Sequence, residues 1–194
     1  MTEHLNEAQM QAVLHRDGPM LVLAGPGSGK TLVITKRIEH LIGREEIDPS
    51  NILVVTFTKA AATEMKKRFC ARMPQEGSRV TFGTFHAVFF MILKYAYHFR
   101  AENIIREEEK YQFFREAVQS MKLDYEDETE FVEEISAEIG RVKTDRIPVE
   151  HYYPSGLPKD VFGRIYREYD AFLHRQHKID FDDMLVYTYE LFSQ

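Results

Sequence analysis

The sequence predicts an α/β fold in which a parallel sheet with flanking helices is joined to an all-helical inserted subdomain. Two observations support this prediction. Strand-like and helix-like segments alternate through residues 1–95, which is typical of a parallel sheet covered by helices. No convincing strand pattern occurs across residues 96–178, where apolar residues recur at three- and four-residue spacing. Residues 179–194 are expected to return to the first domain.

The first part of the chain contains three expected strands and three expected helices. Short apolar or β-branched runs predict strands at Leu21–Ala24, Asn51–Phe57 and Arg79–Phe85. Apolar periodicity predicts helices at Thr31–Ile42, at Ala60–Met73 and from about His86.

The helical part contains three amphipathic segments with charged faces, at residues 107–123, 128–144 and 160–178. The acidic run at residues 124–134 is interpreted as the solvated start of a helix. A proline-rich stretch, Ile147–Asp160, is expected to be a loop whose adjacent tyrosines, Tyr152 and Tyr153, have packing roles.

Composition is that of an ordinary globular protein. The chain has 194 residues, of which 44% are hydrophobic and 29% charged, so one or two domains with a real core are expected. The longest apolar run, Ala87–Leu93, is too short to span a bilayer, and the N-terminus has no apolar signal region, so no membrane partner and a cytoplasmic location are expected. The single cysteine, Cys70, lies in a helical pattern and is expected to be a packing residue.

Charge is unevenly distributed. Residues 1–100 carry 13 Lys/Arg and 9 Asp/Glu, whereas residues 101–194 carry 12 and 22, so the two parts differ as +4 against −10 within a net charge of −6. Because nucleic-acid binding needs only a local basic face, the first part stays a candidate for it and the second does not.

The stretch LVLAGPGSGKTLVITKRI, residues 21–38, has the pattern of a phosphate-binding loop. A buried strand would lead into a loop without regular structure, whose backbone amides converge on an anion at the start of a helix. The loop residues are Ala24, Gly25, Pro26, Gly27, Ser28 and Gly29. Lys30 would reach the terminal phosphates of a nucleotide, and the Thr31 hydroxyl would bind Mg²⁺. Ala24 replaces the first glycine of the strict pattern, and the alternative is a glycine-rich turn with a solvated lysine.

Five ordered segments identify a family resemblance. They are LNEAQMQAV (5–13), the loop just described, TFTKAAATEMKKR (56–68), GTFHAVFFMIL (83–93) and IDFDDML (179–185). In this order they resemble the N-terminal motifs of UvrD/Rep/PcrA-type superfamily 1 DNA helicases, over nearly the whole chain. The resemblance implies a P-loop NTPase (RecA-like) sheet domain, with ATP and Mg²⁺ as cofactors and single-stranded and duplex DNA as partners.

The first segment resembles the family's Q motif, whose glutamine, here Gln9, contacts the edge of adenine. An amide offers both a donor and an acceptor to that edge. The alternative is a capped amphipathic helix with Asn6 as its N-cap and with Leu5, Val13 and Leu14 buried. Many relatives have an arginine after the loop threonine that stacks on adenine, whereas this chain has Leu32.

The resemblance assigns DNA contacts to the ends of two expected strands. These contacts are Phe57, Thr58 and Lys59 after one strand and Thr84 and His86 after the next. Phe57 could stack on a base, and the hydroxyls could bind a phosphate. Many relatives have Asn-Lys where this chain has Lys59 and Ala60, so Lys59 is the candidate for that lysine's role. The alternatives are a core Phe57, a solvated Lys66–Arg68 face, and a capping or core His86.

The last of the five segments contains three carboxylates. Asp180, Asp182 and Asp183 could suggest a metal site, but the resemblance places them at the return from the helical insertion. We therefore expect Asp182 and Asp183 to cap the following helix.

Hydrolysis in this family also uses an Asp-Glu pair at the end of a later strand, and no apolar strand followed by Asp-Glu occurs after Thr31. The resemblance therefore implies an N-terminal part of a 3′ to 5′ helicase, inactive alone, whose partner is the missing C-terminal motor domain. Two alternatives stay open: the motor subunit of a DNA end-processing helicase-nuclease, and a non-hydrolysing nucleotide-binding switch module.

Overall fold

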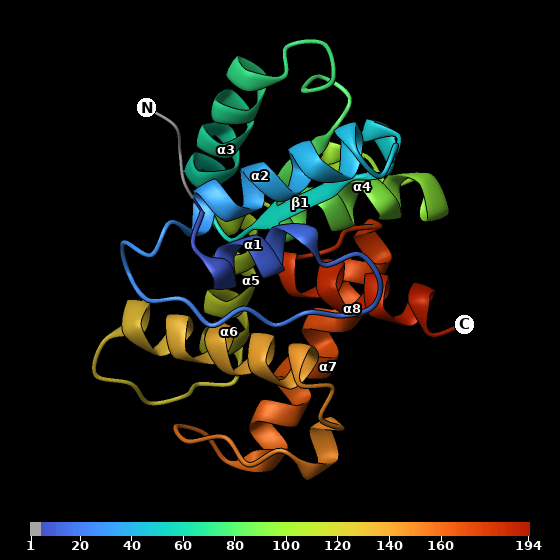
Figure 1. The fold of residues 1–194 in the computed structure, drawn as a ribbon. Helices are drawn as coiled ribbons and strands as arrows, with labels where there is room; N and C mark the ends of the chain where they lie inside the picture. Colours follow the sequence, from blue (N-terminus) through green and yellow to red (C-terminus); the bar gives the residue numbers. More distant parts are fainter. Residues whose placement is uncertain (1–4) are drawn as a thin grey trace. The chain divides into compact units, whose positions relative to one another are not determined.

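The computed structural model describes residues 5–194, which form two compact units. The first extends to Val88 and the second comprises Phe89–Gln194 (Figure 1). None of the helices within residues 5–194 is long and apolar enough to cross a membrane.

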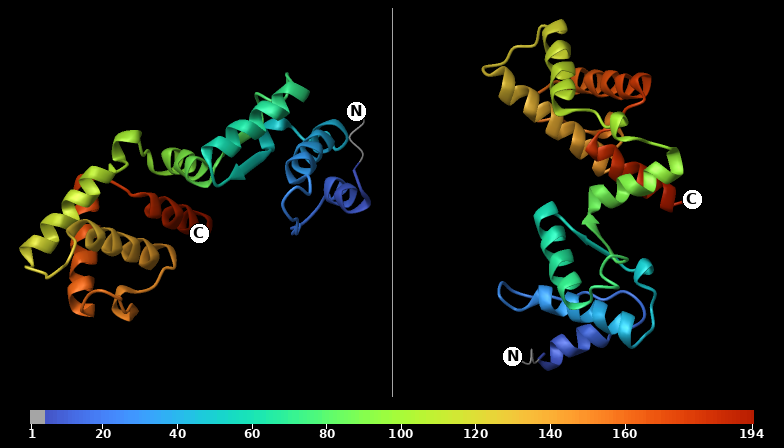
Figure 2. Two further views of the ribbon diagram at one scale, coloured as in Figure 1. Left: turned by 90° about the vertical axis from the view of Figure 1, so that its left-hand side faces the viewer. Right: turned by 90° about the horizontal axis from the view of Figure 1, so that it is seen from above.

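The first unit is built around a small parallel sheet. Its two strands, β1 (Leu53–Thr56) and β2 (Thr81–Thr84), pair in a register that places Leu53 beside Thr81 and Thr56 beside Thr84. Both lie within predicted strands, but the sheet is smaller than the sequence predicts. The helices of this unit are α1 (Glu7–Leu14), α2 (Lys30–Gly43), α3 (Lys59–Arg72) and the start of α4 (Phe85–Tyr97) (Figure 2).

The core of the first unit combines side chains from α2, α3 and the strand region. Its buried members are Ile38, Ile52, Phe69 and Val80. The ring of Phe82 on β2 packs against Phe69 with centroids 5.8 Å apart. Cys70 lies half-buried on α3 beside Gly77, so its packing role is confirmed.

The predicted strand at Leu21–Ala24 is wrong for this structure. The segment has no regular hydrogen bonding, and the side chains of Leu21 and Leu23 are 86% and 88% exposed. A strand needs a neighbour to satisfy its amides and carbonyls, and the two strands formed by residues 5–194 pair with each other. Residues 21–24 therefore have the composition of a strand but lie beside no strand with which they pair in this structure.

Helix α1 begins at a reciprocal cap. The Asn6 side chain accepts a hydrogen bond from the Gln9 amide (2.8 Å), and Gln9 Oε1 accepts one from the Asn6 amide (2.9 Å). The predicted Asn6 cap and the burial of Val13 are confirmed. Burial of Leu14 is wrong, because this last helical residue is 51% exposed, and Leu5 is only half-buried.

The second unit is helical, with α5 (Glu107–Ser120), α6 (Glu128–Thr144), α7 (Lys159–Gln176) and α8 (Phe181–Phe192) following the end of α4 (Figure 2). Helices α5, α6 and α7 surround one apolar core, whose fully buried side chains include Phe114, Val132, Phe162, Ile165 and Tyr169. The apolar spacing of the sequence therefore predicts these helices well.

Local features of this unit follow the sequence in part. Asp127 caps α6, which confirms that the acidic run starts a helix. Tyr152 is buried against Phe162, with centroids 5.2 Å apart, as predicted. Tyr153 is 77% exposed with its ring facing Lys159, so its predicted packing role is wrong.

A buried ion cluster fixes the start of α8. Asp180, not Asp182, is the N-cap, and Asp183 completes a reciprocal capping box with it. Lys143 Nζ on α6 donates to Asp180 Oδ2 (2.9 Å) and Asp183 Oδ1 (2.7 Å). The Tyr169 hydroxyl also donates to Asp180 Oδ2. Asp180 and Asp183 therefore have structural roles: they cap α8 and pair with Lys143.

The two carboxylates of this cluster have opposite pKa shifts. Burial, together with the adjacent Asp180 carboxylate, raises the pKa of Asp183 to about 6. Burial raises the pKa of Asp180 as well, but the charge and hydrogen bond of Lys143, together with the hydrogen bond from the Asp183 amide, outweigh burial and lower that pKa. In the part of the chain that the structure describes, no group of three His, Cys, Asp or Glu side chains is arranged to bind a metal ion.

Candidate functional site

The glycine-rich loop adopts a conformation that its glycines allow. Gly27 and Gly29 have φ angles of 73° and 80°, in the left-handed region that side chains disfavour. A Cβ atom at Gly29 would also lie 3.2 Å from Gln9 Nε2, a tight contact. The sequence of the loop and its backbone shape therefore agree.

Helix α2 starts without a capping side chain. Its N-cap is Gly29, whereas side chains cap α1 and α3, and Thr84 Oγ1 accepts from the Ala87 amide at the start of α4. The first amides of α2 are consequently left for an external acceptor. An anion suits this position because the helix dipole adds positive potential there. The donor set fits the phosphates of a nucleotide.

Lys30 and Thr31 occupy the first turn of α2. The Lys30 ammonium folds over the loop and donates to the carbonyl oxygens of Ala24 (3.2 Å) and Gly25 (2.8 Å). Thr31 is half-buried, and its carbonyl accepts a hydrogen bond from Thr35 Oγ1. Phosphate oxygens could replace the two carbonyls as acceptors for Lys30.

A pocket of about 400 Å³ lies between α1, the loop and α2. Of the predicted nucleotide-binding residues, it brings together Gln9, Ala24, Gly25, Ser28 and Lys30. Pro26, Gly27, Gly29 and Thr31 complete the loop and the helix start. Gln9 Nε2 donates to the Ser28 carbonyl (3.0 Å), so its amide joins the helix cap to the loop. To contact adenine, the Gln9 side chain would have to give up its hydrogen bonds with the Asn6 amide and the Ser28 carbonyl.

Arg37 is a pocket residue that the sequence analysis missed. It lines the pocket from α2, and its Nη1 donates to the carbonyl oxygens of Ala12 (2.9 Å) and His15 at the end of α1. A guanidinium group has several donors in a fixed plane, so it can join these carbonyls while bordering the cavity. Arg37 belongs to no motif. Its only signal in the sequence is that it lies two helical turns after Lys30 and so on the same face of α2.

The predicted DNA-contacting residues gather at the carboxyl edge of the sheet. Because Thr56 pairs with Thr84, the residues that follow each strand emerge side by side. Phe57 is 88% exposed there, so the alternative that it belongs to the core is wrong. Lys59 is exposed in the first turn of α3, and His86 is half-buried in the first turn of α4.

Two threonine hydroxyls at this edge already serve as helix caps. Thr58 Oγ1 accepts from the Ala61 amide (3.1 Å), and Thr84 Oγ1 accepts from the Ala87 amide (3.2 Å). Since a hydroxyl also carries one donor, each can still donate to an external oxygen. The edge thus offers a ring, two hydroxyls and a cation. Lys66, Lys67 and Arg68 are exposed farther along α3, as the solvated-face alternative requires, and Arg68 pairs with Glu64.

Phe85 is the second residue that the sequence analysis missed. Its ring lies beside Phe57, with centroids 5.4 Å apart and planes inclined at 50°. A signal existed in the sequence, because both strands end in the same dipeptide, Thr56-Phe57 and Thr84-Phe85. Equivalent positions on neighbouring parallel strands predict neighbouring side chains.

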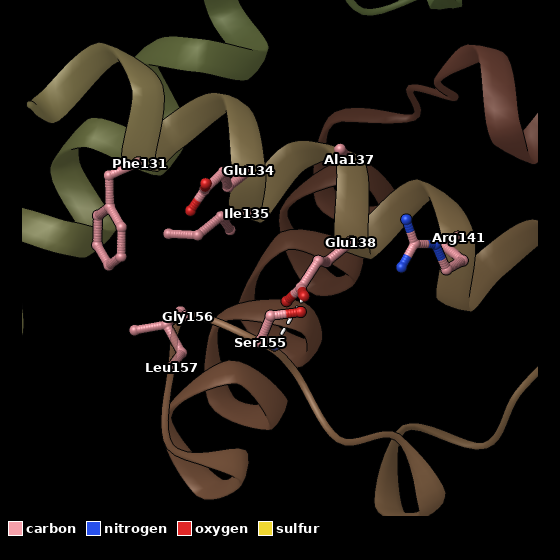
Figure 3. A pocket seen from close by; sticks show the side chains of 9 residues that line it. All are labelled: Phe131, Glu134, Ile135, Ala137, Glu138, Arg141, Ser155, Gly156 and Leu157. Atoms are coloured by element: carbon pink, nitrogen blue, oxygen red, sulfur yellow. Dashed lines mark hydrogen bonds between the residues drawn. The ribbon is translucent and has the colours of Figure 1, made fainter.

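Another pocket, of about 390 Å³, lies in the second unit between α6 and the loop at Ser155–Leu157 (Figure 3). Figure 3 shows the Glu138 carboxylate, which accepts a hydrogen bond from the Ser155 amide at 2.8 Å. None of its lining residues is a predicted nucleotide or DNA contact. Two carboxylates, Glu134 and Glu138, line the pocket together with the cation Arg141, whereas the predicted site residues lie in the first unit, which therefore contains the candidate site.

These features define a class: a mostly helical domain with a small parallel sheet and a glycine-rich loop of the phosphate-binding type at the start of a helix. The chain belongs to the UvrD/REP helicase N-terminal domain family, which it matches over residues 5–194.

Similar curated proteins have helicase names. A putative ATP-dependent DNA helicase YjcD from Bacillus subtilis is 36% identical over 98% of this chain and 26% of that protein. A probable DNA helicase II homologue from Mycoplasma capricolum is 36% identical over 98% of this chain and 27% of that protein. The ATP-dependent DNA helicase PcrA of Leuconostoc citreum is 32% identical over 100% of this chain and 26% of that protein. The chain therefore spans about a quarter of the length of these relatives.

Proposed function

We propose that this chain is the N-terminal, ATP-binding part of a DNA translocase that moves 3′ to 5′ on single-stranded DNA and unwinds duplex. One observation carries the proposal. The uncapped start of α2, with Lys30 folded over its loop, and the exposed Phe57 edge belong to the same compact unit. Coupling of ATP turnover to movement needs a nucleotide site linked to a strand-binding edge, and this unit supports the proposal because it contains candidates for both.

The nucleotide side of the proposal assigns one role to each group. The amides of the loop and of the first turn of α2 bind the phosphates, and Lys30 neutralises the terminal one. The Thr31 hydroxyl would hold Mg²⁺, which would supply positive charge to offset that of the phosphates. Gln9 contacts the adenine edge after releasing the Ser28 carbonyl. These roles are supported by the pocket that places Gln9, Ser28 and Lys30 together.

The DNA side assigns the edge of the sheet to a single strand. Phe57 stacks on a base, Thr58 and Thr84 donate to phosphate, Lys59 supplies charge, and His86 lies next to the strand path. The exposure of Phe57 and the parallel register support this assignment.

We further propose that residues 1–95 and 179–194 form one RecA-like motor domain and residues 96–178 its helical insertion. Its sheet would be larger than the pair β1 and β2, with further strands supplied by parts of the full-length protein outside these residues. The catalytic carboxylates and a second motor domain would come from the same source. On this basis the 194-residue chain alone does not hydrolyse ATP.

Displacement of streptavidin from biotinylated oligonucleotides tests the direction of movement in the full-length gene product. With ATP and Mg²⁺, movement from 3′ to 5′ removes streptavidin from a 5′-biotin and leaves a 3′-biotin occupied. Displacement only from the 3′ end would reverse the proposed polarity, and displacement from neither end would contradict translocation.

A further inference from the structure

The two aromatic rings at the edge of the sheet, Phe57 and Phe85, differ in exposure. Phe57 follows β1 in the short connection to α3, and its ring is 88% exposed. An exposed phenylalanine has few contacts to select one rotamer, so alone it would sample several orientations. A base-stacking surface works best when its orientation is fixed before the base arrives.

Phe85 has the opposite surroundings. It is half-buried at the junction of β2 and α4, where the Thr84 hydroxyl caps the Ala87 amide. Its backbone is therefore held by a strand on one side and a capped helix on the other. The separation of 5.4 Å and the inclination of 50° lie within the range that favours aromatic pairs.

We propose that Phe85 is a positioning residue that orients the Phe57 ring for stacking on a nucleobase of single-stranded nucleic acid. The inference rests on the proposed function, because it assumes that Phe57 contacts a base. It makes Phe85 an indirect contributor, since the exposed ring of Phe57 is the surface that a base can reach.

Binding of an oligonucleotide that carries one 2-aminopurine base tests this inference in the full-length gene product. Stacking of a ring on 2-aminopurine changes its fluorescence, so the probe reports orientation as well as affinity. Phe57→Ala is expected to weaken binding about fivefold to a hundredfold and to remove the fluorescence change. Phe85→Leu is expected to weaken binding about twofold to tenfold and to reduce the fluorescence change, and Phe85→Tyr restores both.

A double-substitution cycle separates positioning from direct contact. If Phe85 acts through Phe57, Phe57→Ala with Phe85→Leu binds no more weakly than Phe57→Ala alone. Additive losses would overturn the positioning role. Phe82→Leu is the matched control, because Phe82 lies on β2, three residues before Phe85, but its ring packs on Phe69 in the core. It is expected to lower Tm without altering the fluorescence change.

The outcomes distinguish this inference from the proposed function. Loss with Phe57→Ala but none with Phe85→Leu overturns the role of Phe85 alone. No loss with Phe57→Ala overturns the proposed base contact and the inference with it. If Phe85→Leu does not fold, Phe85→Met, which keeps volume but lacks a ring, is measured instead with the same expected loss.

Discussion

At the scale of single residues, the candidate nucleotide pocket contains Lys30, whose hydrogen bonds to loop carbonyl oxygens can be replaced by bonds to phosphate. Lys30 has no carboxylate partner among residues 5–194 and is held by two loop carbonyls. Neutral acceptors bind an ammonium group less strongly than anionic oxygens do, so a phosphate can displace them. The bonds of Lys30 to the loop carbonyls therefore stabilise the loop, and under the proposed function phosphate oxygens replace them.

Replacing Lys30 tests this assignment. Lys30→Ala is expected to lower the ATPase rate of the full-length gene product about a hundredfold or more, because charge on the transferring phosphate would be uncompensated. Lys36→Ala is the control, since Lys36 lies on the same helix but pairs with Glu39 at 3.0 Å. Equal rates for the two variants would refute the role of Lys30.

Gly29 provides a second test at this scale, on stability. Gly29→Ala is expected to lower the free energy of unfolding by about 1–2 kcal/mol, because its φ of 80° is unfavourable for a residue with a Cβ atom. Gly43→Ala, at the other end of α2, has open space around it and should be neutral or stabilising by up to about 1 kcal/mol. Thermal or urea denaturation of both variants measures the difference, and similar effects would contradict the structural role of Gly29.

At the scale of elements, backbone hydrogen bonds inside the helical unit join the segment before α5 to the segment before α8. The Ile105 amide donates to the Ile179 carbonyl (2.9 Å), and the Ile179 amide donates to the Asn103 carbonyl (2.7 Å). The residue after Ile179 is Asp180, and Lys143 on α6 binds its carboxylate and that of Asp183 at the start of α8. The start of α8 is thus held by a backbone pair and by a buried cation.

Removal of that cation should be severe. Lys143→Met is expected to lower the free energy of unfolding by about 3–5 kcal/mol, because it leaves Asp180 and Asp183 buried without their counter-ion. Arg164→Met, which breaks an exposed pair with Glu168 on α7, should change it by less than about 1 kcal/mol. Chemical denaturation distinguishes the two, and comparable losses would show that the cluster contributes no more than a surface pair.

The ion pair between Glu109 on α5 and Lys178, which precedes Ile179, predicts that stability depends on pH. The hydrogen bond from Lys178, with those from Arg106, lowers the pKa of Glu109 from 4.5 to about 2. A lowered carboxyl pKa stabilises the folded state above pH 4.5, and this contribution is lost as pH falls towards 2. The Glu109→Gln variant should therefore lose stability less steeply over this range than the unsubstituted chain. Parallel curves, or the same flattening with Glu108→Gln, would contradict this assignment.

The elements also show which features a sequence can predict. Helices with strong apolar periodicity, α5, α6 and α7, were predictable because each buries one face locally. The segment Leu21–Ala24 was not, because a strand depends on a neighbour that periodicity does not specify. Asp180 was missed as the cap because three carboxylates within four residues satisfy the same pattern, and only the hydrogen bond from the Asp183 amide to Asp180 Oδ1 identifies the N-cap.

In the candidate site, predictability follows the same division. The glycine loop, Lys30 and Gln9 could be predicted because their spacing along the chain is the signal. Arg37 and Phe85 contribute through contacts across elements, with the end of α1 and with Phe57 respectively. Such contacts depend on helix packing and strand register, which local patterns indicate only after the sheet is known.

At the scale of the whole molecule, sequence charge and site location agree. The first hundred residues, with a net charge of +4, contain the loop, the pocket and the exposed edge, whereas the residues after them have a net charge of −10. A polyanion would be repelled by the second part and tolerated by the first.

The central claim is that ATP turnover at Lys30 is coupled to a DNA strand. It is tested most directly by measuring ATP hydrolysis with and without single-stranded DNA, for the 194-residue chain and the full-length gene product side by side. The account predicts hydrolysis that DNA stimulates in the longer protein and none in the 194-residue chain. Bound nucleotide with no hydrolysis by either protein, or hydrolysis that DNA leaves unchanged, would contradict it.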